Sequence, residues 1–306
     1  MAYAKNISSD RGLTWRMMMT GLFLVILWGL ITAILFAIGL GITFIAIIMF
    51  AGIFSQYWFS DRIALFGMGG RIVTPQEAPQ LHAMVDRLCA MADMPKPRVA
   101  IAEIDMPNAF ATGRSPKAAV VCVTTGIQAR LSDEELEAVL AHELSHVAHR
   151  DVAVMTIASS VGMIAGLLTR VAMFSSMVGG NDNQNQNNAL LEVGVMLASI
   201  VIYFISYLLT LALSRYRELA ADRSGALLIG KPAVLAAALV KVTGDMSKIP
   251  QRDLRKQEAY NAFFFTPALA GKQSSSLANL FSTHPSLEKR LAQLDDLERR
   301  LGQSAA

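Results

Sequence analysis

Long stretches without charge are the first pattern visible along the chain. No charged residue occurs between Met17 and Ser60, which is enough for two helices of about 20 residues that each cross a membrane. Residues 39–41, Gly-Leu-Gly, would form the turn between them. We expect residues 17–60 to form a transmembrane hairpin, because the apolar core of a signal peptide is only about 7 to 15 residues long.

A second pair of apolar stretches follows later in the chain. Residues 152–173 are apolar apart from Arg170, and residues 193–213 carry no charge. The Asn- and Gln-rich residues 179–188 between them are polar and of low complexity, which is typical of a loop. We therefore expect a second transmembrane hairpin over residues 152–213.

The segment between the hairpins has short helix and strand patterns, which are typical of a folded domain. Residues 74–77 fit a capping box with proline at the first helical position, which predicts a helix from residue 75 to about residue 93. Residues 98–103 and 118–125 have the composition of β-strands, with a turn-rich stretch over residues 107–117 between them. This segment therefore predicts a small β-sheet preceded by a helix.

Helical spacing dominates the rest of the chain. Ser132 and Glu135 fit a second capping box, and apolar residues recur at helical spacing from Leu136 to Val147. A helix that carries Glu218 is expected to run to about residue 229, and a further helix is expected over residues 232–243. A looser stretch at 247–282 then precedes a final helix over residues 286–301. The predicted fold is mainly α with a small β-sheet. Its domain is assembled from residues 61–151 and 214–306, with residues 1–16 as a separate N-terminus.

Composition and charge agree with two membrane hairpins. The chain has 306 residues, of which 53% are hydrophobic and only 17% charged, which is too apolar for an ordinary soluble domain. Two hairpins place every Lys and Arg except Arg170 on the side that holds both termini, and the positive-inside rule makes that side the cytoplasm. The net charge of +3 needs no nucleic acid to explain it, since juxtamembrane cations attract anionic lipids. We expect a lipid bilayer and no nucleic acid as a partner.

Residues 142–146, with the sequence HELSH, carry the most chemical information. The imidazoles of His142 and His146 are four residues apart on a predicted helix, so they project to the same side and can share one metal ion. The carboxylate of Glu143 then lies beside that metal. This spacing is typical of zinc sites in which the glutamate acts as a general base.

A catalytic zinc ion needs at least a third protein ligand, with a fourth position left for water. Glu218 is the candidate, and Asp222 lies one turn later on the same helix face, where it can accept the spare N–H of a ligand histidine. The alternative is an ordinary helix face on which both carboxylates form ion pairs with Arg215, Arg217 and Arg223. We expect one zinc ion per chain.

These residues together predict peptide hydrolysis. Zinc bound by His142, His146 and Glu218 would polarise the scissile carbonyl and lower the pKa of a bound water, from which Glu143 would take a proton for the leaving amine. His284 is the best remaining donor to the developing oxyanion. The alternative for His284 is an ordinary position at the start of a helix.

A strand edge beside the metal would hold a substrate chain in an extended conformation through main-chain hydrogen bonds. The candidate segment is Asn108-Ala109-Phe110-Ala111, just before Gly113. The alternative is an ordinary loop without contact to the substrate.

Taken together, these features resemble the HtpX family of bacterial membrane metalloproteases, which are relatives of the Ste-type CAAX prenyl proteases within the gluzincins. The resemblance covers nearly the whole chain and includes the two-hairpin layout. The segments that carry it are residues 142–146 with Arg150 and Asp151, residues 107–113, residues 218–222, and His284-Pro285 with Arg290.

The resemblance implies a membrane-anchored, zincin-like zinc endopeptidase of the bacterial cytoplasmic (inner) membrane. Its substrates would be misfolded or damaged membrane proteins under stress, alongside other membrane quality-control proteases. The implied residues are zinc ligands His142, His146 and Glu218, catalytic Glu143, and functional positions at Asn108, His284 and Arg290.

Two other functions fit parts of the sequence. A prenyl-protein protease would share the metal site, but that class usually has more transmembrane helices than the four predicted here. A membrane scaffold or transporter without catalysis would leave the metal residues unused, and only Arg170 and Glu192 suggest a translocation path. Both of these residues lie near one end of the second hairpin.

Overall fold

The computed structural model describes residues 11–38, 47, 50–51, 53–55, 57–178, 186–246 and 282–304. Its helices and strands follow one another along the chain in this order: α1 (Arg11–Ile38), α3 (Ser60–Gly67), β1 (Gly70–Ile72), α4 (Pro79–Ala92), β2 (Arg98–Ala102), β3 (Ala109–Thr112), the 3-10 turn η2 (Pro116–Ala118), β4 (Val120–Thr124), α5 (Thr125–Arg130), α6 (Asp133–Ala148), α7 (Asp151–Val178), α8 (Gln186–Ile229), α9 (Pro232–Met246) and α12 (Leu287–Ser304).

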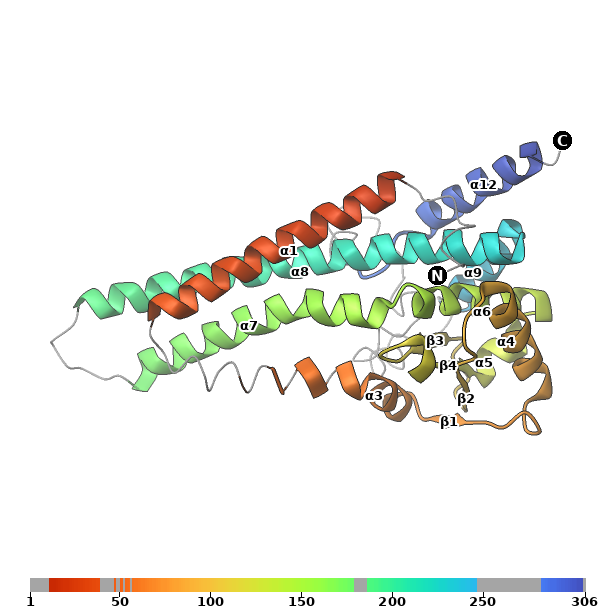
Figure 1. Ribbon diagram of the computed structural model, residues 1–306, viewed down its shortest axis with the longest axis horizontal. Coiled ribbons are helices and arrows are strands. Elements are labelled where there is room, and N and C mark those ends of the chain that lie inside the picture. Colours follow the sequence, from red (N-terminus) through yellow and green to blue (C-terminus); the bar gives the residue numbers. More distant parts are fainter. Residues whose placement is uncertain are drawn as a thin grey trace.

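Three long helices extend away from a smaller mixed α/β region, as Figure 1 shows. Helix α8 packs against both α7 and α1, and α1 also contacts α7. Their contact surface is a separate apolar cluster that includes Leu24, Val161, Ile164 and Ile202. On their outer faces many large apolar side chains are exposed, for example Phe204 at 49%. Such a surface is unfavourable in water and is typical of a contact with lipid.

The number of membrane spans is supported only in part. Among the described residues, the segment Val193–Ile229 of α8 is long and apolar enough to cross a membrane on its own. A second candidate arises only when α6 and the first part of α7, bent by 61°, are counted together. The four spans therefore stay a prediction, and the predicted turn at residues 39–41 lies outside the described residues.

Helix α8 joins two segments that the sequence separates. It runs without interruption from Gln186 to Ile229, so the apolar stretch 193–213 and the helix that carries Glu218 are one continuous element. It also takes in the last residues of the predicted polar loop, of which residues 179–185 lie outside the described part. A rigid helix therefore connects the proposed membrane region to the metal residues.

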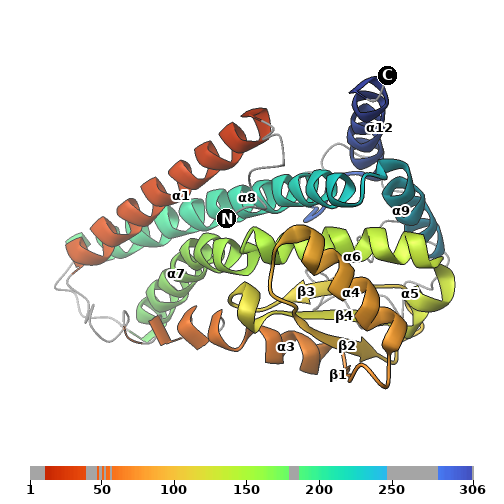
Figure 2. The same ribbon diagram turned by 45° about the vertical axis from the view of Figure 1, so that its right-hand side comes forward.

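The sheet has the strand order β1-β2-β4-β3. Strands β2 and β4 are parallel, β1 pairs with β2 antiparallel, and β3 pairs with β4 antiparallel with Phe110 opposite Cys122. Figure 2 shows β3 at the edge of the sheet next to α6, and the two elements are in contact. Within the turn-rich stretch 107–117, Ala109–Thr112 forms the edge strand, which overlaps the segment 108–111 expected to offer a strand edge beside the metal.

The start of α4 also differs from the sequence prediction. The side chain of Glu77 accepts hydrogen bonds from the N–H (2.7 Å) and the hydroxyl (3.0 Å) of Thr74, but the N–H of Glu77 donates to the carbonyl of Thr74 rather than to its hydroxyl, so only half of the capping box forms. The helix begins at Pro79 rather than at Pro75. A residue that precedes proline is sterically excluded from the helical region, and Ala78 accordingly has φ −139° and ψ 64°. The segment before it closes as a turn instead.

The other helices predicted outside the two hairpins are confirmed, and one core holds them together. Ser132 and Glu135 form the reciprocal capping box at the start of α6. Buried apolar residues of the sheet, α4, α6, α8, α9 and α12 make one continuous cluster, which includes Leu88, Val121, Leu140, Leu239 and Leu294. Because α6, α8 and α12 share this core, their polar faces are held at fixed distances from one another.

Candidate metal centre

Helix α6 presents both motif histidines on one face. The two rings lie edge to face with their centroids 4.8 Å apart, and Nε2 of His142 is 3.2 Å from Nε2 of His146. His142 is fully buried, whereas the side chain of His146 is 12% exposed. Two ring nitrogens thus face a common point from one helix, as the four-residue spacing predicts.

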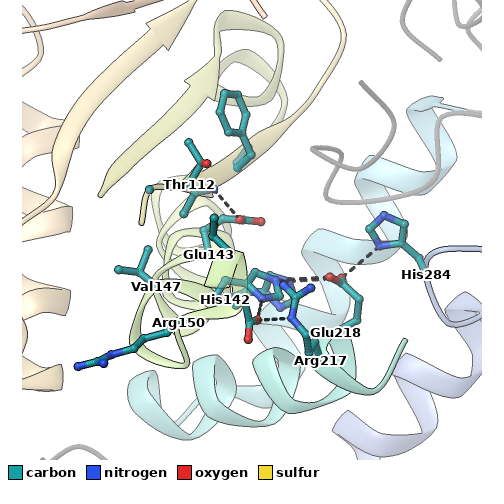
Figure 3. Close-up of a pocket in the computed structure, with 15 residues that line it drawn as sticks. Thr112, His142, Glu143, Val147, Arg150, Arg217, Glu218 and His284 are labelled. Carbon is teal, nitrogen blue, oxygen red and sulfur yellow. Dashed lines mark hydrogen bonds and ion pairs between the residues drawn. The ribbon is translucent and has the colours of Figure 1, made fainter. Parts of the chain in front are cut away.

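Helix α8 brings Glu218 to the same point. Its Oε1 lies 3.4 Å from Nε2 of His146, and its Oε2 lies 3.7 Å from Nε2 of His142. Figure 3 shows the carboxylate directed from α8 toward the histidines of α6. These three residues form the group of possible metal ligands found among the described residues, with all ligand atoms within 4.8 Å of one another.

The three side chains fit a zinc ion. Zinc binds imidazole nitrogen and carboxylate oxygen at about 2.0 to 2.2 Å in a tetrahedron, which places neighbouring ligand atoms about 3.3 to 3.6 Å apart. The two Nε2 atoms are 3.2 Å apart, and the two oxygens of Glu218 lie 3.4 Å from Nε2 of His146 (Oε1) and 3.7 Å from Nε2 of His142 (Oε2), all close to that range. In addition, Oε2 of Glu218 is buried without a hydrogen bond of good geometry, its nearest further nitrogens being Nδ1 of His284 at 3.2 Å and an Nη of Arg290 at 3.9 Å, so it can still bind a cation.

A carboxylate and a guanidinium hold the ring of His142 from behind. Asp222 Oδ1 lies 2.9 Å from His142 Nδ1, so the carboxylate contacts this side of the ring while Nε2 faces the metal position. Arg290 of α12 donates two hydrogen bonds, of 2.7 and 2.6 Å, to the two oxygens of Asp222. The structure therefore places Asp222 and Arg290 behind the first histidine and not in contact with the metal position.

Electrostatics around His142 favour a positive charge. Burial acts to lower the pKa of this ring, but its hydrogen bonds with Asp222 and Glu218 outweigh burial and raise the pKa to about 9. The same carboxylates that retain a proton on His142 would stabilise a metal cation at that point.

His146 has an analogous support that the sequence interpretation did not include. Its Nδ1 lies 2.6 Å from Oδ2 of Asp151, the first residue of α7, and Arg217 Nε lies 3.0 Å from the same oxygen. Asp151 was considered only as part of the family resemblance, and Arg217 only as a surface cation. The five-residue separation between His146 and Asp151 becomes meaningful only because α6 and α7 meet at an angle of 61°.

Glu143 is buried beside the histidines, on the side of the sheet edge. Its Oε2 accepts a hydrogen bond of 3.0 Å from the N–H of Ala111 in β3. Burial raises the pKa of the carboxyl, and the two neighbouring histidines oppose that shift. A carboxylate whose proton affinity is increased by burial is suited to act as a general base near neutral pH.

His284 lies across the site from α6. Its ring is 5% exposed, and its Nδ1 is 3.2 Å from Oε2 of Glu218 (Figure 3). The ring thus contacts a candidate ligand directly, a position that the sequence did not predict. If Nδ1–H donates to Glu218, the ring has a second N–H for an oxyanion only when it is protonated.

A small cavity of about 70 Å³ opens beside these residues. The backbone of residues 109–113 forms one wall, and Glu143, His146, Glu218 and His284 form the others. Among the predicted substrate-binding residues, Ala109 and Phe110 line the cavity. Asn108 is fully buried, and its backbone pairs with Thr124 of β4, so its side chain does not reach the cavity.

A glycine of α8 allows the two metal-bearing helices to approach closely. Gly225 lies on the same helix face as Glu218 and Asp222. A Cβ atom added there would come within 2.7 Å of the backbone nitrogen of His142 and 2.9 Å of its Cα. Because only glycine fits this contact, the separation between α6 and α8 depends on it. The sequence interpretation gave Gly225 no role.

Comparison with known proteins gives one consistent family. The family model Peptidase family M48 matches residues 75–298. The chain is 56% identical over 298 residues to Protease HtpX homolog 1 of Streptomyces coelicolor, covering 97% of both chains. It is 50% identical to Protease HtpX homolog of Moorella thermoacetica, over 97% of this chain and 98% of that one.

A solved structure has a similar fold. The crystal structure of Ste24p from S. mikatae superimposes with a TM-score of 0.56, over 93% of this chain and 67% of that chain. The sequence identity is 16%. The arrangement of helices and the small mixed sheet is therefore shared with Ste24p.

Proposed function

Because this chain belongs to Peptidase family M48 and is a membrane metalloprotease, we propose that its metal is one zinc ion held by His142, His146 and Glu218. The observation that carries the proposal is that two imidazole nitrogens of α6 and the carboxylate of Glu218 on α8 converge with separations of 3.2 to 3.7 Å, close to the edges of a zinc tetrahedron. When bound there, zinc would lower the pKa of a water molecule and polarise the substrate carbonyl.

Glu143 is the proposed general base. Its carboxylate lies beside the two histidines and faces the cavity, so it can take a proton from the attacking water and deliver it to the leaving amine. The Ala111 N–H holds this carboxylate in place from the sheet edge. Burial keeps competing water away from the proton transfer.

The edge strand β3 is the proposed substrate-binding element. Alternate residues of a strand direct their main-chain groups to the same side, and the Ala111 N–H points toward Glu143 and away from β4. A substrate that adds to this edge would lie alongside the cavity wall formed by residues 109–113. His284, on the opposite wall, is the proposed donor to the oxyanion.

Substrate class and location are proposed from the position of the site along α8. Glu218 lies five residues beyond Leu213, the end of the uncharged stretch, which is about 7.5 Å along a helix. The cavity would therefore lie close to the membrane surface, on the side that the positive-inside rule makes cytoplasmic. Such a site suits misfolded or damaged proteins of the cytoplasmic membrane, whose unfolded segments emerge beside the bilayer.

The alternatives have less support. The likeness to Ste24p concerns the fold and carries no substrate with it. A scaffold without catalysis would have to bury Glu143, Glu218 and Asp222 together for no chemical reason, at a considerable cost in desolvation.

The test of the proposal is Glu143→Gln in the full-length protein purified in detergent. We expect this variant to retain one zinc ion per chain and to lose cleavage of an unfolded membrane protein, because an amide of similar size cannot accept the proton. Glu137→Gln, the same change on another face of α6 where the half-buried Glu137 pairs with Arg87, is the matched control and should cleave like the wild type. Cleavage by Glu143→Gln at the wild-type rate would refute the mechanism.

A further inference from the structure

We propose that Asp151, fixed by Arg217, is a positioning residue for the zinc ligand His146, and that it makes metal binding depend on the junction of α7 and α8. The proposal rests on the proposed function, because it assumes that His146 is a ligand. It adds to that function a structural link between the metal and the two helices of the predicted second hairpin.

Both nitrogens of the His146 ring are engaged in defined directions. Nδ1 lies 2.6 Å from Asp151 Oδ2, and Nε2 lies 3.4 Å from Glu218 Oε1 on the metal side. A carboxylate behind a ligand histidine fixes the tautomer, orients the ring and increases the basicity of the coordinating nitrogen. The Asp151 side chain is only 4% exposed, so little water weakens this contact.

The backbone between the two residues is shaped for this contact. Helix α6 ends at Ala148, and Arg150 adopts a left-handed conformation with φ 56° before α7 begins at Asp151. A non-glycine residue in this region is energetically unfavourable and persists only where the surroundings impose it. The resulting bend turns the Asp151 carboxylate back toward the last turn of α6, where His146 is located.

Arg217 completes the arrangement from another helix. Its Nε lies 3.0 Å from the same Asp151 oxygen that contacts His146, and its side chain is 13% exposed. Arg217 directly precedes Glu218 on α8, so one helix supplies both a proposed metal ligand and the cation behind the opposing histidine. Figure 3 shows Arg217 beside Glu218 on the same helix, and both residues line the metal cavity.

The two ligand histidines are therefore held in the same way by different parts of the fold. His142 is supported by Asp222 and Arg290, which join α8 to α12. His146 is supported by Asp151 and Arg217, which join the first residue of α7 to α8. In the predicted topology Asp151 directly precedes the apolar stretch 152–173, so a change in the packing of α7 against α8 would alter the orientation of His146.

The experiment measures zinc affinity in the full-length protein, by competition with a chromogenic chelator, for the wild type and for Asp151→Asn. We expect the variant to bind zinc about 10 to 100 times more weakly, the usual effect of losing such a partner. With cobalt in place of zinc, its visible absorption should also change, because the coordinating ring is no longer held in one orientation.

Asp61→Asn is the matched control. Asp61 is a buried aspartate that pairs with Arg98 between α3 and β2 and does not line the metal cavity. Its loss should leave the zinc affinity within about twofold of the wild type, so a general effect of removing a buried ion pair is separated from an effect on the metal.

A purely structural role for Asp151 would give a variant with wild-type zinc affinity and an unchanged cobalt spectrum, which would overturn the proposal. If Asp151→Asn does not fold, Arg217→Gln tests the proposal instead. We expect this variant to lose zinc affinity about tenfold, the lower end of the same range. An unchanged zinc affinity in Arg217→Gln would overturn the proposal. Failure of the wild type to bind zinc would instead refute the proposed function.

Discussion

Replacing Gly225 with alanine tests whether the distance between α6 and α8 sets the activity. The new Cβ would lie 2.7 Å from His142 N, 2.9 Å from His142 Cα and 3.0 Å from the carbonyl carbon of Ala141. All three are backbone atoms, which cannot move aside as a flexible side chain can. Ordinary contacts begin at 3.4 Å, so the two helices must separate locally by about 0.7 Å (3.4 minus 2.7).

The size of the effect follows from that displacement. Overpacking of a well-packed contact lowers the free energy of unfolding by about 1 to 3 kcal/mol. The higher helix propensity of alanine raises it by about 1 kcal/mol. The net loss of stability should therefore be about 0 to 2 kcal/mol, and the protein should remain folded. Activity should suffer more, because a misplacement of about 1 Å at a catalytic site can cost about 100-fold, so we expect kcat/KM to fall about 10- to 100-fold.

The measurement compares Gly225→Ala with Gly244→Ala in thermal unfolding, zinc content and cleavage rate. Gly244 is a helical glycine of α9 at which an added Cβ meets nothing within 4 Å, so its replacement should leave cleavage unchanged and stabilise the protein by up to about 1 kcal/mol. Equal cleavage rates in the two variants would show that the contact with His142 does not determine the geometry of the site.

Three further predictions concern the ligands, His284 and the topology. The double variant His142→Ala, His146→Ala should contain no zinc by elemental analysis, and zinc content equal to the wild type would reject the ligand assignment. His284→Ala should lower kcat by the equivalent of about 2.7 to 4 kcal/mol in the barrier while zinc is retained, and unchanged turnover would leave His284 a residue at a helix start. A cysteine introduced at Asn185 should react with a membrane-impermeant reagent in intact cells while one at Gln303 does not, and the reverse pattern would invert the predicted orientation.

The cluster of His142, His146 and Glu218 could be predicted because its information is local. His142 and His146 lie on one helix, as do Glu218 and Asp222, and a spacing of four residues fixes their relative direction before any tertiary structure is known. The capping box at Ser132 fixes the start of the first helix in the same way. The sequence pattern does not itself show that the two helices are in contact. A catalytic zinc site needs three protein ligands, however, so the prediction of such a site implied that contact.

Other parts of the site could not be predicted because their meaning is tertiary. Asp151 depends on the bend after α6, and Gly225 depends on a backbone from another helix. For the edge strand β3, the sequence indicated a strand edge at residues 108–111, but its antiparallel pairing with β4 and its end at Gly113, with φ 130°, are tertiary features. The burial of Asn108 likewise follows from its pairing with β4 and not from its own polarity.

The balance of buried charge explains why the site suits a divalent cation. Negative charge comes from four buried carboxylates, namely Glu143, Asp151, Glu218 and Asp222. Two guanidinium groups, those of Arg217 and Arg290, oppose them with side chains that are 13% and 2% exposed. The protein alone therefore leaves two negative charges uncompensated, and an uncompensated buried charge costs several kcal/mol.

A cation with two positive charges would neutralise this cluster completely. Without it, a proton on His142 supplies part of the positive charge, which agrees with the rise in the pKa of this ring to about 9. A proton on a ring nitrogen occupies the position of the metal bond, so zinc must displace it in order to bind. The carboxylates that orient the ligands thus also make the site select the metal by its charge, because a monovalent ion would satisfy only half of the deficit.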